Sequence, residues 1–164
     1  MPEAYLHTTV QRLAQFDADV TAAELTQLGD ALNRCLANVH VFELDLAAPQ
    51  ASGFAIECLA GPSPAWNALV AAVRQAVGQT WGPELPDPPF GPHVSLAYAT
   101  GDVDDSEIAR RLADATPVGR LRIDEVSLVT VTVRPEVGTF DFAVLANFSL
   151  AERPRQDSNL RATD

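Results

Sequence analysis

The segment that decides the fold is Gly91-Pro92-His93-Val94-Ser95-Leu96-Ala97. It follows a proline-rich stretch, and its pattern predicts a β-strand over residues 93–99. Residues i and i+2 of a strand point to the same face, so His93 and Ser95 are expected side by side. The opposite face is expected to belong to the core and to carry Val94, Leu96 and Tyr98.

A second histidine has the same context near the start of the chain. Residues Leu6-His7-Thr8-Thr9-Val10 repeat the order of histidine, any residue, hydroxyl residue and apolar residue. They predict a strand over residues 4–11, with His7 and Thr9 on one face. Each histidine thus has a hydroxyl beside it on the same face of a strand.

Each of these strands opens a similar unit, which makes a weak internal repeat. After His7 come an acidic loop, a predicted helix over 21–37 and a strand over 39–46. After His93 come an acidic loop, a helix over 105–115 and a strand over 120–134. The repeat predicts an α+β fold with two similar lobes that face one another, so that both histidines and both hydroxyls converge on one cleft.

The helices have recognisable ends. Thr21 and Glu24 form a capping box at the start of the first helix. Ser63 and Pro64 begin a helix over 64–77, and Gly78 is expected to end it. The third helix is expected to turn Ile108 and Leu112 inward.

The remaining elements are strands. Residues 39–46 alternate, with His40, Phe42, Leu44 and Leu46 on one face, and residues 52–60 form a short apolar strand. The strand over 120–134 is joined to one over 139–150 by residues 135–138, a hairpin signal. The last strand is expected to present one apolar face: Phe140, Phe142, Val144, Ala146, Phe148 and Leu150. Residues 1–150 are therefore expected to form one bilobal domain, and residues 151–164 a disordered tail.

Two imidazoles and two hydroxyls suit phosphodiester chemistry without a metal or other cofactor. One imidazole can accept a proton from the attacking water, while the other, protonated, donates one to the leaving oxygen. The hydroxyls can donate hydrogen bonds to the non-bridging phosphate oxygens as charge builds there.

The two motifs resemble those of the two-histidine phosphoesterase superfamily, which includes the bacterial 2′-5′ RNA ligase-like proteins. The second motif is the better match, since a proline before the histidine is typical of the family. The resemblance covers residues 5–150 and implies a bilobal α+β fold with both motifs in a central cleft. It also implies metal-independent action on 2′,3′-cyclic or related phosphodiesters, with His7 and His93 as the acid/base pair and Thr9 and Ser95 as phosphate binders.

The chain departs from the family pattern at its start. Family members usually have a strand and a helix before the first motif, whereas six residues precede His7 here. We expect either a short variant or a start inside a longer reading frame. A missing strand predicts a bare sheet edge in the first lobe.

Composition restricts the partners. Eleven basic and 22 acidic side chains give a formal charge of −11 over 164 residues. Nonspecific binding to long nucleic acid rests on cationic side chains and is therefore disfavoured. No secretory signal and no apolar run of transmembrane length is visible, so we expect no membrane association and a cytoplasmic location. Small nucleotides or RNA-terminal cyclic phosphates are the expected partners.

Other side chains have two interpretations. Arg134 could bind a phosphate, although an exposed surface arginine explains it as well. Trp81 and Phe90 could stack on a nucleobase or pin the proline-rich loop. His40 lies on an apolar face and is expected to be structural. Cys35 and Cys58 have no metal-type spacing and are expected to be buried, reduced thiols.

Three other functions fit the same sequence. An RNA 2′-5′ ligase of the same family is a close variant, although a long RNA suits the charge poorly. A metal-dependent hydrolase would need ligands that neither motif supplies at the usual spacing. A non-catalytic module that keeps the fold and binds a nucleotide is the third.

Overall fold

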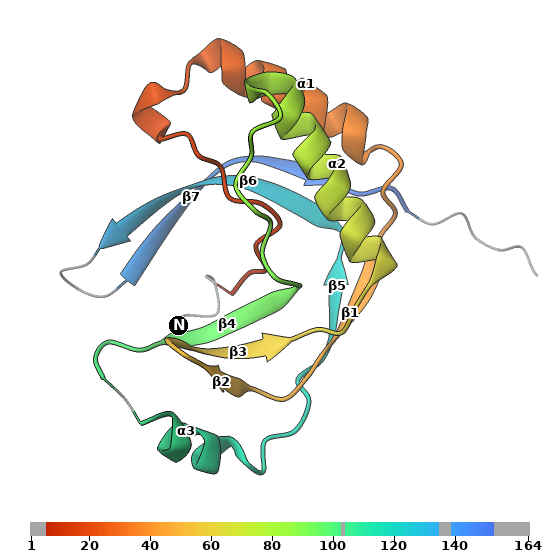
Figure 1. Cartoon of the computed structure of the whole chain (residues 1–164). Helices are drawn as coiled ribbons and strands as arrows, with labels where there is room; N and C mark the ends of the chain where they lie inside the picture. The colour runs from red at the N-terminus through yellow and green to blue at the C-terminus, as the bar shows by residue number, and fades with distance from the viewer. Residues whose placement is uncertain (1–5, 103, 135–138, 153–164) are drawn as a thin grey trace, which may run out of the picture.

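The computed structural model describes residues 6–102, 104–134 and 139–152. Its regular elements are η2 (Asp17–Asp19), α1 (Ala22–Leu36), β1 (Phe42–Leu46), β2 (Gln50–Ser52), β3 (Ala55–Leu59), α2 (Pro64–Trp81), β4 (His93–Tyr98), α3 (Asp105–Leu112), β5 (Gly119–Ile123), β6 (Glu125–Arg134) and β7 (Thr139–Ser149). All strand ladders are antiparallel and pair as β1–β5, β2–β3–β4 and β6–β7 (Figure 1). The α+β class expected from the sequence is confirmed.

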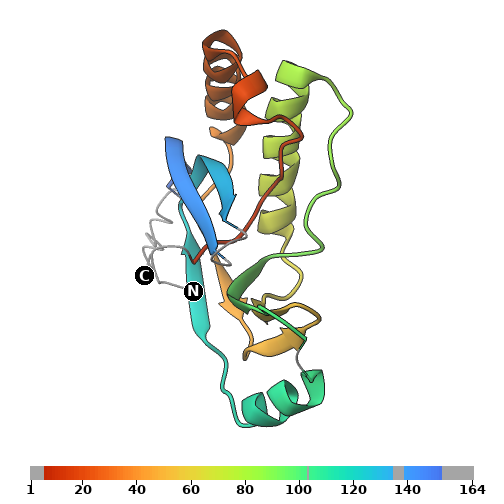
Figure 2. The same ribbon diagram turned by 90° about the vertical axis from the view of Figure 1, so that its left-hand side faces the viewer.

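The elements form two unequal lobes. Helices α1 and α2 pack side by side at one end, over β1, β5 and the β6–β7 hairpin, whereas α3 lies beside β2 at the other end (Figures 1 and 2). The final strands of the two repeat units, β1 and β5, pair with each other, with Leu44 opposite Leu121. The pairing joins the two units at the elements that the sequence repeat treats as equivalent.

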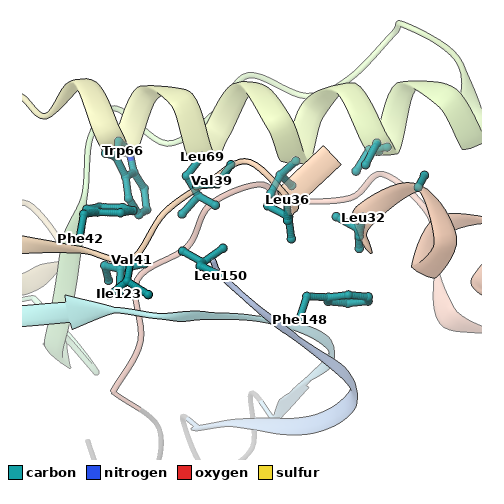
Figure 3. Packing of buried hydrophobic residues seen from close by; sticks show 14 of the residues in the cluster. Leu32, Leu36, Val39, Val41, Phe42, Trp66, Leu69, Ile123, Phe148 and Leu150 are labelled. Atoms are coloured by element: carbon teal, nitrogen blue, oxygen red, sulfur yellow. The ribbon is translucent and has the colours of Figure 1, made fainter. Parts of the chain in front are cut away.

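The main core lies between the two long helices and the strands beneath them. Leu32 and Leu36 of α1 and Trp66 and Leu69 of α2 face Phe42, Ile123, Phe148 and Leu150 (Figure 3). A smaller cluster of Leu46, Cys58 and Val94 lies below β3 and β4. Burial raises the pKa of the Cys58 thiol. Both cysteines are free, although Cys35 is only half-buried.

Helix α1 begins at the predicted capping box. The Glu24 amide donates to Thr21 Oγ1 at 3.2 Å, and the Thr21 amide donates to Glu24 Oε2 at 2.8 Å. Trp81 Nε1 donates to the other carboxylate oxygen at 3.2 Å, which ties the end of α2 to the start of α1. Thr21 Oγ1 also donates to Glu24 Oε2 at 2.6 Å, and this bond, followed by those from the Thr21 amide and Trp81, lowers the pKa of Glu24. The stabilisation is therefore present above the unfolded-state pKa and is lost as the pH falls through the lower folded-state value.

Replacing Thr21 with alanine is expected to destabilise the protein by about 1 kcal/mol, the usual cost of losing an N-cap side chain. Urea denaturation followed by circular dichroism measures the change. Thr26→Ala in the same helix is the matched control, because its hydroxyl bonds to the Ala22 carbonyl within the helix and caps nothing. Equal destabilisation by both substitutions would contradict the role of the cap.

The predicted end of the second helix at Gly78 is wrong. Helix α2 continues to Trp81, and Gly82 ends it with a φ of 92° and an amide bond to the Gly78 carbonyl. Glycine inside a helix costs only about 1 kcal/mol. Buried Ala76 and Val77, together with the Trp81–Glu24 bond, hold the extra turn against α1.

Two predicted strands are each divided. The strand over 120–134 breaks at Asp124, because β5 pairs with β1 and β6 pairs with β7. The strand over 52–60 becomes β2 and β3 around a turn at Gly53, where φ is +60°. Helix α3 ends at Leu112, and neither Ile108 nor Leu112 is fully buried. The predicted turn at 135–138 and most of the predicted tail lie outside the described residues.

The first predicted strand is also wrong. Residues 6–9 belong to no strand, and the chain runs irregularly as far as η2. A strand is stabilised by its ladder, and no described strand pairs with this segment in the sheets. In the described part of the chain, no helix is both long enough and apolar enough to cross a membrane.

Candidate active site

Strand β4 positions the second motif as the alternation predicts. His93 lies opposite Leu59 and Ser95 lies opposite Glu57, so these four residues share one face of the β2–β3–β4 sheet. Val94 points to the other face and packs with Cys58 and Leu46. The buried valine therefore anchors the strand while the histidine and the serine stand together on its other side.

A bulge at Leu96 changes the rest of that strand. Ile56 pairs with Ala97 and Glu57 pairs with Ser95, so Leu96 is an extra residue without a partner in the β3–β4 register. Tyr98 then lies opposite Ala55, on the same face as His93 and Ser95. The expectation that Tyr98 faces away from the histidine is wrong for this reason.

Glu57 is the residue of this face that the sequence did not single out. Its side chain is buried, and its Oε1 accepts a hydrogen bond from Ser95 Oγ at 3.2 Å. His93 Nε2 lies 3.8 Å from the same oxygen, close enough for an ion pair when the imidazole is protonated. The other oxygen, Oε2, is buried without a hydrogen-bond partner among the described residues.

The His93 ring is held from two sides. Its Nδ1 lies 2.9 Å from the Gly91 carbonyl oxygen. A hydrogen bond forms between them when Nδ1 carries a proton and donates it. Phe90 stacks on the ring with a centroid distance of 4.6 Å and an interplanar angle of 9°. This arrangement fixes the ring orientation and leaves Nε2 as the nitrogen that can exchange a proton.

The first motif approaches from an irregular segment instead of a strand. In both views this segment passes between β4 and the β6–β7 hairpin (Figures 1 and 2). The His7 ring meets Phe142 of β7 edge-on at 4.9 Å. Thr8 Oγ1 is buried without a hydrogen-bond partner among the described residues, and Thr9 is half-buried.

A second bulge, in β7, decides which face of the β6–β7 hairpin carries its aromatic side chains. Leu128 pairs with Ala146 and Val129 pairs with Val144, so Leu145 is the extra residue. The single apolar face predicted for the last strand is therefore wrong. Ala146 and Phe148 face the helical core, whereas Phe140, Phe142 and Val144 point to the opposite face.

The two lobes meet through these aromatic side chains. Tyr98 of β4 lies 5.5 Å from Phe140 of β7 between ring centroids, and it stacks on Phe54 at 6.2 Å. His7 contacts Phe142, which lies on the same face of β7 as Phe140. The first motif and the strand of the second motif therefore contact neighbouring positions of one strand.

Arg134 does not lie on the face of the β6–β7 hairpin that contacts His7 and Tyr98. It pairs with Thr139 in the β6–β7 register, on the face opposite Phe140 and Phe142. Its guanidinium donates to Asp141 Oδ2 at 2.8 Å, and both side chains are half exposed. The interpretation of Arg134 as an exposed surface arginine fits this placement, and its contact with a phosphate stays a prediction.

The other candidates are also placed. His40 is exposed instead of lying on the apolar face with Phe42, because β1 begins only at that phenylalanine. Trp81 belongs to the last turn of α2 and packs against the core. Phe90 is 76% exposed beside His93. Among the described residues, no group of three or more histidine, cysteine, aspartate or glutamate side chains is arranged to hold a metal ion.

Comparison with known proteins identifies the family. The model of the 2′-5′ RNA ligase superfamily matches residues 6–134, a range that includes both histidine motifs. The chain belongs to the 2′-5′ RNA ligase superfamily. No curated protein matches it in sequence.

Solved structures share the superfamily fold. TT0787 of Thermus thermophilus is 21% identical with a TM-score of 0.70, over 92% of this chain and 80% of that one. E. coli LigT in complex with 3′-AMP is 16% identical with a TM-score of 0.62, over 90% of this chain and 78% of that one. LigT in complex with ATP is 17% identical with a TM-score of 0.61, over 92% and 78%.

Proposed function

We propose that this member of the superfamily is a metal-independent phosphodiesterase that opens the 2′,3′-cyclic phosphates of small nucleotides or RNA ends. His7 and His93 form the acid/base pair, and Thr9 and Ser95 bind the phosphate. The observation that carries the proposal is the shared face of His93 and Ser95 on β4, together with the contact of His7 and β4 with the same side of β7.

The chemistry needs one proton acceptor and one proton donor on opposite sides of the phosphorus. One imidazole takes a proton from water as the water oxygen bonds to phosphorus. The other imidazole, protonated, gives its proton to the ribose oxygen as that P–O bond breaks. The product is a 2′- or 3′-phosphomonoester. The contact of His93 Nδ1 with the Gly91 carbonyl makes Nε2 the atom of this histidine that takes part.

Small nucleotides are the favoured ligands for two reasons. LigT has been crystallised with 3′-AMP and with ATP, and we extend this class of ligand to the present chain. The formal charge of −11 disfavours an extended polyanion, because such binding depends on many cationic contacts to phosphate. A single cyclic phosphate needs only the local donors of the two motifs.

The test is an assay of the four nucleoside 2′,3′-cyclic phosphates in the presence of EDTA, with the product identified as the 2′- or the 3′-phosphate. Full activity in EDTA is expected. Loss of activity that added metal restores would favour the metal-dependent hydrolase. Joining of RNA ends without cyclic phosphate hydrolysis would favour the ligase. A ligand-dependent rise in Tm without turnover would favour the binding module.

Phe90→Ala is expected to lower kcat about three- to tenfold, because a stacked aromatic pair contributes about 0.5–1.5 kcal/mol to holding a ring in place. Phe54→Ala is the matched control, since Phe54 is similarly exposed but stacks on Tyr98 and makes no ring contact with His93. Steady-state kinetics on the preferred cyclic nucleotide separate the two. An unchanged kcat in the Phe90 variant would show that its stacking does not support His93.

A further inference from the structure

Ser95, which is proposed to bind the phosphate, and His93, which is proposed to exchange a proton during the reaction, both approach one carboxylate of the protein. Ser95 Oγ donates to Glu57 Oε1 at 3.2 Å, and His93 Nε2 lies 3.8 Å from that same oxygen. A phosphate oxygen bound by Ser95 and His93 must therefore come within a few ångströms of the Glu57 carboxylate.

The Glu57 carboxylate is poorly screened. The residue is 4% exposed, so little water reaches it. The arginine ion pairs of the described residues join other, surface carboxylates, and the only described group within ion-pair distance of Glu57 is His93. Two like charges a few ångströms apart repel each other much more strongly in such a place than in water.

The substrate and the product of the proposed reaction differ in charge. A 2′,3′-cyclic phosphate is a diester with one negative charge. A phosphomonoester carries a negative charge of about 1.5 to 2 at neutral pH. We propose that Glu57 is a specificity-determining residue that selects singly charged phosphodiesters against doubly charged phosphomonoesters. The inference rests on the proposed function, because it takes the phosphate to bind at Ser95 and His93.

This selection has a direct consequence for turnover. Hydrolysis converts a ligand with one charge into a ligand with nearly two beside the same carboxylate. The repulsion rises only after the chemical step. It therefore favours release of the product and weakens binding of the substrate to a smaller extent. Glu57 would thereby limit product inhibition.

The experiment compares two ligands that differ by one charge. They are 2′-deoxyadenosine 3′-phosphate and its methyl ester, and neither can form a cyclic phosphate because the 2′-hydroxyl is missing. Isothermal titration calorimetry in EDTA gives both dissociation constants for the wild type and for Glu57→Gln. The ratio of monoester to diester Kd is expected to fall about tenfold or more in the variant, mainly through tighter monoester binding.

Three further variants make the result specific. Glu57→Asp keeps the charge and should keep most of the selection. Glu57→Met removes both the charge and the unpartnered oxygen, and it is the second uncharged variant if the glutamine protein folds poorly. Glu43→Gln removes an exposed carboxylate paired with Arg120 on the β1–β5 ladder and should leave the ratio unchanged.

An unchanged ratio in both uncharged variants overturns the inference, and so does a failure of both to bind either ligand. Turnover of cyclic nucleotides by the wild type is measured separately. Turnover by the wild type together with an unchanged ratio of dissociation constants would refute charge selection by Glu57 and leave the proposed enzyme activity intact. A changed ratio of dissociation constants without turnover would support charge selection by Glu57 and refute the proposed enzyme activity.

Discussion

His93→Ala and His7→Ala are each expected to lower kcat/KM on a nucleoside 2′,3′-cyclic phosphate by roughly 10²–10⁴-fold, the range for loss of a general acid or base. His93 is held by the Gly91 carbonyl and the Phe90 ring, so its removal deletes a preorganised proton carrier. His7 is packed on Phe142 and supplies the second proton transfer. Because both groups act in one reaction, the double variant should lose less than the product of the two single effects.

The third histidine provides the matched control. His40 is exposed and precedes β1, so His40→Ala should change kcat/KM by less than about twofold, within the scatter of a surface substitution. Circular dichroism and Tm establish that each variant is folded. Retention of full activity by either His7→Ala or His93→Ala in a folded protein would falsify its assignment as acid or base.

Leu69→Ala should have the largest effect on stability. Leu69 has no exposed surface and packs between α2 and the strands beneath it (Figure 3). Replacing a fully buried leucine with alanine costs roughly 2–5 kcal/mol, because transfer energy is lost and a cavity remains. Urea denaturation measures the free energy of unfolding.

The control for this substitution is Val118→Ala, because Val118 is 58% exposed and lies between α3 and β5. Its free energy of unfolding should change by less than about 0.5 kcal/mol. A loss below about 1 kcal/mol for Leu69→Ala would show that the helices do not pack on the strands as described.

Local patterns were sufficient to predict much of this molecule. The Thr21–Glu24 box and the Ser63–Pro64 start are signals contained within a few residues, and both helices begin there. The side-by-side placement of His93 and Ser95 follows from strand alternation alone. The superfamily was recognisable because both motifs are short and contiguous.

The errors have a common cause in contacts between distant segments. Leu96 and Leu145 are ordinary strand residues, and nothing beside them in sequence marks a bulge; the partner strand decides the register. Alternation therefore placed Tyr98 and Phe140 on the wrong faces. Gly78 is a stop signal in isolation, yet the packing of α2 on α1 extends the helix past it.

Glu57 was missed for a related reason. It lies in a short segment that reads as an apolar strand, where one acidic residue carries no motif. Its importance comes from the register that places Ser95 opposite it and from its burial beside His93. Both are properties of the folded sheet, so they could not be read from the neighbouring residues.

The two bulges uncouple the faces of the site from the number of residues in β4 and β7. Loss of the single codon for Leu96 would make Ser95 and Ala97 neighbours opposite Glu57 and Ile56, so β4 would alternate regularly and Tyr98 would stay on the face of His93 and Ser95. Loss of the codon for Leu145 would likewise keep Phe140 and Phe142 on their present face of β7. Each leucine is therefore an insertion that its strand absorbs as a bulge, and a gene that lost either codon would still encode a strand with the same side chains on the same faces.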